Sequence, residues 1–199
     1  MSHLEKFTKV YADNIWGGSG GGSLPDFTKT YRQFLEDWMF SHSIESVVDF
    51  GCGDWMFSYL IDWSNVSYLG VDCVKSVIEE NLRKHSRWGI AFMHCPSTEE
   101  FFDEIPGADL LIVKDVFQHW SNADVVSFLT QATKRYQYIL ITNGSNQTED
   151  WEESPDPVMT AARHLAARFE PLKGFGARKV LDYADNPNDP KEISQITRD

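Results

Sequence analysis

The feature that most constrains the fold is residues 47–55 (VVDFGCGDW), an apolar segment that ends in an acid and two closely spaced glycines. Apolar residues that lead into Gly51 and Gly53 indicate a buried strand that turns sharply into the next element. A second apolar segment, residues 68–72, also ends in an acid, roughly twenty residues after the glycines. A strand, a glycine turn, a helix and a strand that ends in an acid are typical of proteins that hold a nucleoside-containing ligand.

The rest of the chain alternates between short apolar segments and stretches with helical periodicity. We expect strands at residues 45–50, 66–71, 90–94, 108–114 and 138–142. We expect helices up to residue 13 and at residues 26–40, 55–62, 74–86, from Ser97, 121–135 and 159–169. This alternation predicts an α/β, Rossmann-like three-layer sandwich with a mostly parallel sheet. Residues 178–183 and 191–197 read as two closing strands, which add a C-terminal antiparallel hairpin and bring the sheet to seven strands.

The length of 199 residues fits one α/β domain, and we expect a single domain over residues 1–199. Within it, residues 45–199 form the Rossmann-like core, and residues 1–44 carry helices and a Gly-rich loop that covers the ligand site. Residues 14–23 (NIWGGSGGGS) also resemble a flexible linker. The start of a helix follows at Ser23 and Pro25, and glycines beside a helix start let backbone N–H groups approach a ligand. Both interpretations of the loop stay open.

The charge and composition of the chain limit the kinds of partner that we expect it to bind. The net charge is −12 and the pI is about 4.8, which disfavours a polynucleotide substrate because nucleic-acid binders carry basic patches. No apolar run is long enough to span a membrane, and the N-terminus lacks the apolar core of a signal peptide, so we expect a cytoplasmic protein with no membrane partner. Cys52, Cys73 and Cys95 are expected to be reduced thiols. Their wide spacing does not fit the usual paired zinc ligands, so we expect no metal.

Residues 49–54 (DFGCGD) resemble the first motif of the class I S-adenosylmethionine-dependent methyltransferases, and Asp72 resembles the acid that ends their second strand. The closing hairpin and the loop at residues 16–23 also resemble that family, so the resemblance spans nearly the whole chain. It implies S-adenosyl-L-methionine as the cofactor and S-adenosyl-L-homocysteine as the product. The chain departs from the family at Trp55, where a third glycine is common. An NAD(P)-type Rossmann oxidoreductase is a competing interpretation, but Met56 stands where its fingerprint needs a third glycine.

The resemblance also implies which residues bind the cofactor. Asp72 would bind the ribose hydroxyls, Arg32 the carboxylate, and Trp16 with Tyr11 would close over the sulfonium. The other implied cofactor-binding residues are Asp49, Gly51, Cys52, Gly53, Asp54 and Trp55 in the turn, Cys73 after the second strand, Pro96, Ser97 and Thr98 beside the adenine, and Lys114, Asp115 and Val116 under the methionine part. Simpler interpretations stay open: a structural turn, an exposed strand end for Asp72 and a surface charge for Arg32.

His119 is the candidate general base, because an oxygen nucleophile benefits from losing its proton and histidine has a suitable pKa. It could equally only pack or cap the next helix. The expected reaction is methyl transfer to an O or N atom of a small-molecule or sugar-like acceptor, since the Asn/Asp-Pro-Pro-Tyr signature of amine methylation on nucleobases is absent. A protein or RNA acceptor stays open, as does a non-catalytic domain that only binds the cofactor. We expect a monomer or a homodimer.

Overall fold

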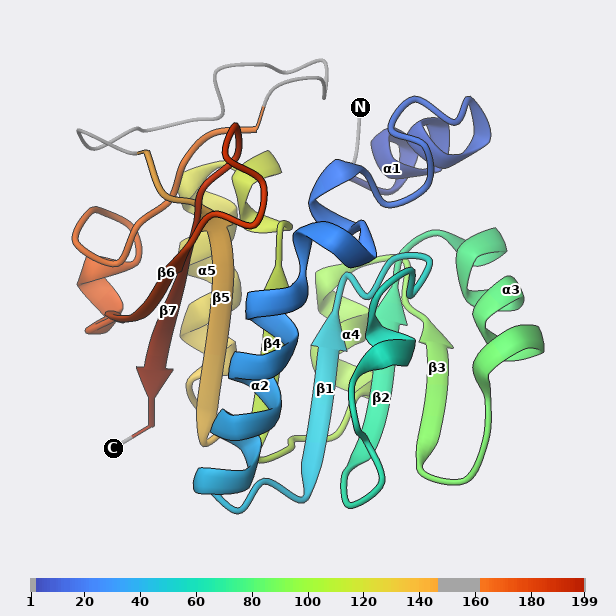
Figure 1. Ribbon diagram of the computed structural model, residues 1–199, viewed down its shortest axis with the longest axis horizontal. Helices are drawn as coiled ribbons and strands as arrows, with labels where there is room; N and C mark the ends of the chain where they lie inside the picture. Colours follow the sequence, from blue (N-terminus) through green and yellow to red (C-terminus); the bar gives the residue numbers. More distant parts are fainter. Residues whose placement is uncertain (1–2, 147–161, 199) are drawn as a thin grey trace. The chain divides into compact units, whose positions relative to one another are not determined.

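The computed structural model describes residues 3–146 and 162–198 (Figure 1). Its contacts divide the chain into two compact units, Met1–Asp109 and Leu110–Asp199. The prediction of one domain over residues 1–199, in which residues 1–44 precede the core, stays a prediction. No helix in the described ranges is long and apolar enough to cross a membrane.

The first unit holds three parallel strands in the order β3-β2-β1. Their bounds are β1 Ser46–Phe50, β2 Ser67–Asp72 and β3 Ile90–His94. The helices of this unit are α1 His3–Ala12, α2 Lys29–Ser41, α3 Lys75–His85 and α4 Thr98–Glu104, with 3-10 turns η1 Gly21–Ser23, η2 Pro25–Phe27 and η3 Ser58–Leu60. The parallel register places Asp49 beside Gly70 and Asp72 beside His94. The glycine turn and Asp72 therefore share the carboxyl edge of these strands.

Aromatic side chains fill the core of the first unit. Trp55 is 1% exposed, and its ring packs on Tyr68 and Phe92 at centroid distances of 5.6 and 5.3 Å. Trp55 has a φ of +58°, a left-handed conformation that a right-handed helix does not accommodate. The helix predicted at residues 55–62 is therefore wrong, and η3 is the only helical turn there.

The second unit holds the remaining strands, β4 Leu110–Lys114, β5 Tyr138–Gly144, β6 Arg178–Tyr183 and β7 Lys191–Thr197. β4 and β5 are parallel, whereas β7 runs antiparallel to both β5 and β6. Its helices are α5 Asn122–Ala132 and the 3-10 turns η4 Phe117–His119 and η5 Lys173–Phe175. The two units together contain seven strands, mostly parallel, with a C-terminal antiparallel pair. The predicted α/β, Rossmann-like class is confirmed.

The helix predicted at residues 159–169 is wrong from residue 162 onward, and its first three residues lie outside the described ranges. The backbone amides of this segment bond to other segments instead of to the preceding helical turn. Arg163 donates to the Gln118 carbonyl, Leu165 to the Gly144 carbonyl, and Ala167 to the Glu192 carboxylate. An apolar, Ala-rich composition was compatible with a helix, but these longer-range hydrogen bonds hold the chain in an extended path.

Candidate functional site

The turn after β1 has an unusual backbone. Gly51, Gly53 and Trp55 all have positive φ, at +77°, +57° and +58°. The amides of Gly51 and Cys52 both donate to the Val71 carbonyl, at 2.8 and 3.1 Å, so the end of β2 fixes the start of the turn. Glycine tolerates this geometry without steric cost, and it leaves room for close approach to the backbone.

Asp72 is the anchor of this turn. Its Oδ2 accepts a hydrogen bond from the Gly53 amide at 3.0 Å, and its Oδ1 accepts one from the Val74 amide at 2.9 Å. The residue is only 8% exposed, and burial raises the pKa of its carboxyl. The Cys73 amide is a further hydrogen-bond donor that acts on this carboxyl, so three backbone donors surround its two oxygens. Asp72 is therefore a buried strand end and not the exposed one that the simpler interpretation assumed.

Asn81 is a second anchor, and the sequence motifs did not predict it. It lies on the buried face of α3 and is 1% exposed. Its Nδ2 donates to the Gly53 carbonyl at 2.7 Å. Asp72 and Asn81 thus hold the amide of Gly53 and its carbonyl from two sides. The available signal was an Asn three and four residues after Ile78 and Val77, the spacing of a buried helix face.

The Gly-rich loop is held against the glycine turn, so it is not a flexible linker. The Ser19 hydroxyl donates to Asp54 Oδ1 at 2.7 Å, and the Ser19 amide donates to Oδ2 at 3.1 Å. The Asp54 amide donates back to the Ser19 hydroxyl at 2.8 Å. The Tyr11 hydroxyl lies 2.7 Å from the same Ser19 oxygen. The sequence predicted a loop over the site, but it did not identify Ser19 as the contact.

The loop's contact requires glycine at Gly18. A Cβ atom there would lie 2.3 Å from Oδ2 of Asp54, and the φ of Gly18 is +87°. We expect Gly18→Ala to release the loop, with faster amide hydrogen exchange over residues 16–23 and weaker binding of any ligand that the loop covers. Gly21→Ala is the matched control, because a Cβ at Gly21 meets nothing within 4 Å. Equal exchange in both variants would contradict this account of the loop.

Acidic groups surround the turn. Burial raises the pKa of the Cys52 thiol well above its usual value, and the negative charges of Asp72, Asp49 and Asp54 raise it further. Asp49 is buried and accepts a hydrogen bond from the Tyr68 hydroxyl at 2.6 Å. A turn surrounded by carboxylates attracts a cationic ligand and repels a phosphate.

The other residues of this unit that were predicted to bind the cofactor lie in several separate surroundings. Arg32 donates through Nη2 to the Pro25 carbonyl at 3.2 Å, and its buried Nε has no acceptor among the described residues. Trp16 packs edge-on against Phe7, and the indole of Trp55 belongs to the aromatic core. The remaining residues follow β2 and β3 and are half-buried: Cys73, Pro96 and Ser97 lie on loops, and Thr98 begins α4.

The loop after β3 is ordered by its own hydrogen bonds. Ser97 caps α4 by accepting from the Glu100 amide at 3.2 Å, as the capping-box pattern predicts. The thiol of Cys95 donates to the Ser97 carbonyl, and burial raises the pKa of this thiol to about 11. His94 Nε2 lies 3.0 Å from the Cys73 carbonyl, which joins the loops after β2 and β3.

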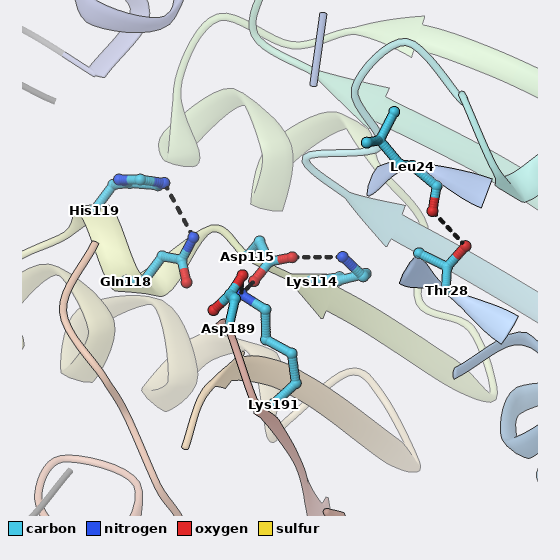
Figure 2. A network of polar contacts seen from close by, with 8 residues as sticks. All are labelled: Leu24, Thr28, Lys114, Asp115, Gln118, His119, Asp189 and Lys191. Carbon is cyan, nitrogen blue, oxygen red and sulfur yellow. Dashed lines mark hydrogen bonds and ion pairs between the residues drawn. The ribbon is translucent and has the colours of Figure 1, made fainter. Parts of the chain in front are cut away.

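In the second unit, Asp115 sits between two buried lysines (Figure 2). It forms ion pairs with Lys114 and, at 2.8 Å, with Lys191 of β7. Lys191 also pairs with Asp189 at 2.9 Å. Burial works against the charge of Asp115, but the two lysines overcome it and lower its pKa to about 2. Lys114 and Asp115 were predicted from the sequence, whereas nothing in the sequence pointed to Lys191.

Two buried amides lie beside this network in the same unit. The side chain of Asn143 is 1% exposed, and neither of its polar atoms has a hydrogen-bond partner among the described residues. The side-chain carbonyl of Gln118 is likewise buried without a described donor, while its amide nitrogen lies 3.3 Å from Nε2 of His119 (Figure 2). His119 is half-buried at the end of η4, and Val116 is 9% exposed in the preceding loop. Buried amides without partners are costly, and such groups often mark a binding site.

No known protein-family model and no curated protein sequence matches this chain. Solved structures do. Magnesium protoporphyrin IX methyltransferase (ChlM) from Synechocystis PCC 6803, with bound S-adenosylhomocysteine, aligns with a TM-score of 0.70 at 12% identity, covering 98% of each chain. A SAM-dependent methyltransferase of Leishmania major aligns with a TM-score of 0.69 at 17% identity, covering 96% of this chain and 80% of that one.

The bifunctional kinase-methyltransferase WbdD aligns with a TM-score of 0.63 at 14% identity, over 86% of this chain. This chain spans only 40% of the length of WbdD. At these identities the likeness establishes the fold: the chain has the Rossmann-like fold of the class I methyltransferases. The resemblance first drawn from residues 49–54 and Asp72 is thereby confirmed at the level of fold.

Proposed function

We propose that this chain is an S-adenosylmethionine-dependent methyltransferase that methylates an O or N atom of a small-molecule or sugar-like acceptor. The observation that carries the proposal is the acidic, glycine-built turn in a chain with this fold. Asp49, Asp54 and Asp72 all act on the same thiol, Cys52. Their combined charge suits the positive sulfonium and ammonium groups of S-adenosylmethionine and opposes the pyrophosphate of a dinucleotide. The charge therefore argues independently against the oxidoreductase interpretation that Met56 already disfavours.

The residues present fit this cofactor. Asp72 is proposed to accept from the ribose hydroxyls with the acceptor capacity that its backbone donors leave free. Arg32 keeps a buried Nε–H donor without a described acceptor, which suits the carboxylate of the methionine part. Gly53 is held by Asp72 and Asn81, and its missing Cβ leaves room for the hydroxyls of Ser19 and Tyr11, which hold the Gly-rich loop against the turn. Roles for Asp49, Cys52, Cys73, Pro96, Ser97 and Thr98 near the cofactor remain part of this proposal.

When bound, S-adenosylmethionine supplies an electrophilic methyl group on a cationic sulfur. The chain's own contribution is to place the acceptor atom in line with that group, and such positioning can supply about 7–11 kcal/mol of the barrier. The Ser19–Asp54 contact holds the Gly-rich loop against the turn. Lys114, Asp115 and Val116, after β4, are proposed to line the methionine part.

Within the second unit, two buried amide side chains are suited to bind a polar ligand. The side-chain carbonyl of Gln118 and both polar side-chain atoms of Asn143 are buried without partners among the described residues, and such groups can orient a polar acceptor. His119 is the proposed general base for an oxygen acceptor. Its Nε2 lies 3.3 Å from the amide nitrogen of Gln118. Because a neutral imidazole has a single lone pair, His119 can take a proton from the substrate hydroxyl through Nε2 only after it gives up a hydrogen bond from Gln118.

The proposal is tested with S-adenosylmethionine carrying an isotope-labelled methyl group. The protein is incubated with this donor and separately with a small-metabolite extract, a protein extract and total RNA. We expect label to enter one or more compounds of the metabolite fraction. Label only in protein or RNA would leave the methyltransferase activity standing and overturn the small-molecule acceptor. Cofactor binding without label in any fraction would favour a non-catalytic cofactor-binding domain.

His119→Ala tests the proposed base once a labelled compound is identified. We expect turnover to fall roughly a hundredfold or more, the usual contribution of general acid–base catalysis, while cofactor affinity stays within about twofold of the wild type. Activity that rises with pH in the wild type should lose that dependence in the variant. His42→Ala is the control, because His42 caps the end of α2 through the Trp38 carbonyl and lies outside the proposed site. An unchanged rate in His119→Ala would show that His119 only packs.

A further inference from the structure

A second concave surface lies at the amino ends of strands β2 and β3, in the first unit. It is a groove of about 390 Å³ formed by the loops that precede these strands, residues 61–67 and 87–90. Ser67 begins β2 and Asp72 ends it. Five strand steps of about 3.3 Å separate them, or roughly 17 Å. The groove is therefore too far from Asp72 to be part of the cofactor site.

The groove has an apolar floor and a polar rim. The floor comes from residues that are at most 9% exposed: Ile61, Trp63, Val66 and Ile90. The rim comes from exposed residues: Asp62, Ser64, Asn65, Ser67, Arg87 and Trp88. Trp88 is the only large hydrophobic side chain among the groove residues that is exposed. A concave surface with one aromatic face and several polar groups is typical of a site for a small polar ligand.

Trp88 is fully exposed to solvent, yet its backbone is fixed. The Ile90 amide donates to the Arg87 carbonyl at 2.9 Å, and the Arg87 amide donates to the Ile90 carbonyl at 3.3 Å. Gly89, with a φ of +80°, completes this tight turn. Folding gains nothing from an indole that stays in water, since the stabilisation comes from burying apolar area. The turn therefore presents a fully exposed indole at a fixed position beside the groove.

Charged groups flank the indole with both hydrogen-bonding roles. Arg87 lines the groove, and its guanidinium lies 5.8 Å from the centre of the Trp55 ring, a contact that restricts this donor. The Asp62 carboxylate accepts from the Ser64 amide at 3.0 Å, and this hydrogen bond lowers its pKa, so it is an ionised acceptor at neutral pH. The Asp62 amide is held by Glu36 at 2.9 Å.

We propose that this groove binds a sugar ring, either of a free saccharide or of a glycan chain. The C–H face of a pyranose is apolar and can stack on the Trp88 indole. Its hydroxyls can accept from Arg87 and donate to Asp62, so one ring uses both kinds of rim group. An anionic ligand is disfavoured by the Asp62 charge. A protein partner would require a wider apolar surface than a single exposed indole.

The test uses a panel of methyl glycosides of glucose, galactose, mannose and N-acetylglucosamine, titrated into ¹⁵N-labelled protein and followed by NMR. The indole N–H signal of Trp88 is identified by its loss in Trp88→Ala. We expect at least one glycoside to shift this signal and the amides of residues 61–67. Trp88→Ala should weaken binding about tenfold or more, and Trp88→Phe should retain part of it, because an aromatic face remains.

Phe40→Ala is the matched control, because Phe40 is 89% exposed and does not line the groove. It should bind the glycoside as the wild type does. All three variants change exposed side chains, so their thermal unfolding should match the wild type. The proposal is overturned if no glycoside of the panel shifts the groove, or if Trp88→Ala binds as well as the wild type. The cofactor affinity of Trp88→Ala should be unchanged, so this test is independent of methyl transfer.

Discussion

Asp72→Ala is expected to weaken the binding of S-adenosylhomocysteine by about 3 kcal/mol, or roughly a hundredfold, because two hydrogen bonds from ribose hydroxyls to a buried carboxylate are lost. Titration calorimetry measures this directly. Because burial raises the pKa of Asp72, binding by the wild type should also weaken as the pH falls through that raised value.

The substitution also leaves the amides of Gly53 and Val74 without their acceptor, so the fold must be checked. Asp72→Asn keeps one acceptor oxygen and the side-chain volume, and it should show an intermediate loss. Asp62→Asn is the control, because it changes an exposed carboxylate of the same unit. It should bind S-adenosylhomocysteine as tightly as the wild type does. Undiminished binding by a folded Asp72→Ala would remove Asp72 from the cofactor site.

Lys191→Ala is expected to destabilise the protein by about 3 kcal/mol, the lower end of the range for breaking a buried ion pair, because Lys114 still pairs with Asp115. Denaturant unfolding measures the change. Lys179→Ala is the control: Lys179 pairs with Asp182, but both side chains are about half exposed, so its loss should hardly change the unfolding free energy. Equal effects of the two substitutions would contradict the assigned role of the buried network.

The same network predicts a pH dependence with a definite sign. Burial raises the pKa of Asp115, but Lys114 and Lys191 outweigh it and lower the value to about 2. A carboxyl whose pKa is depressed on folding stabilises the protein above its unfolded pKa of about 4 and loses that contribution as the pH falls toward the folded value. Lys191→Ala removes one of the two lowering charges. Its unfolding free energy should therefore vary less between about pH 4 and about pH 2 than that of the wild type.

The strands could be predicted because each is a short apolar segment bounded by turn residues. β3, for example, begins and ends at Ile90 and His94 as expected. The absence of a helix at residues 55–62 could not be predicted. The left-handed backbone of Trp55 depends on its burial against Tyr68 and Phe92 and not on local propensity. Tertiary packing decided that segment.

The site was predictable only where a local motif carried it. The sequence pattern around Gly51, Gly53 and Asp72 could be recognised because neighbouring residues determine a turn and the end of a strand. The roles of Ser19 and Lys191 could not be recognised in this way. Ser19 contacts Asp54, 35 residues away in the chain, and Lys191 contacts Asp115, 76 residues away. Long-range polar contacts of this kind leave no periodicity in the sequence, so only the structure reveals them.

The most direct test of the central claim is a pair of titrations of the wild-type protein, one with S-adenosylhomocysteine and one with NAD⁺. We predict saturable binding of S-adenosylhomocysteine, with one molecule per chain, and no measurable binding of NAD⁺, because the acidic turn favours a ligand without phosphates. Binding of NAD⁺ without binding of S-adenosylhomocysteine would contradict the assignment of the cofactor and, with it, the proposed methyltransferase.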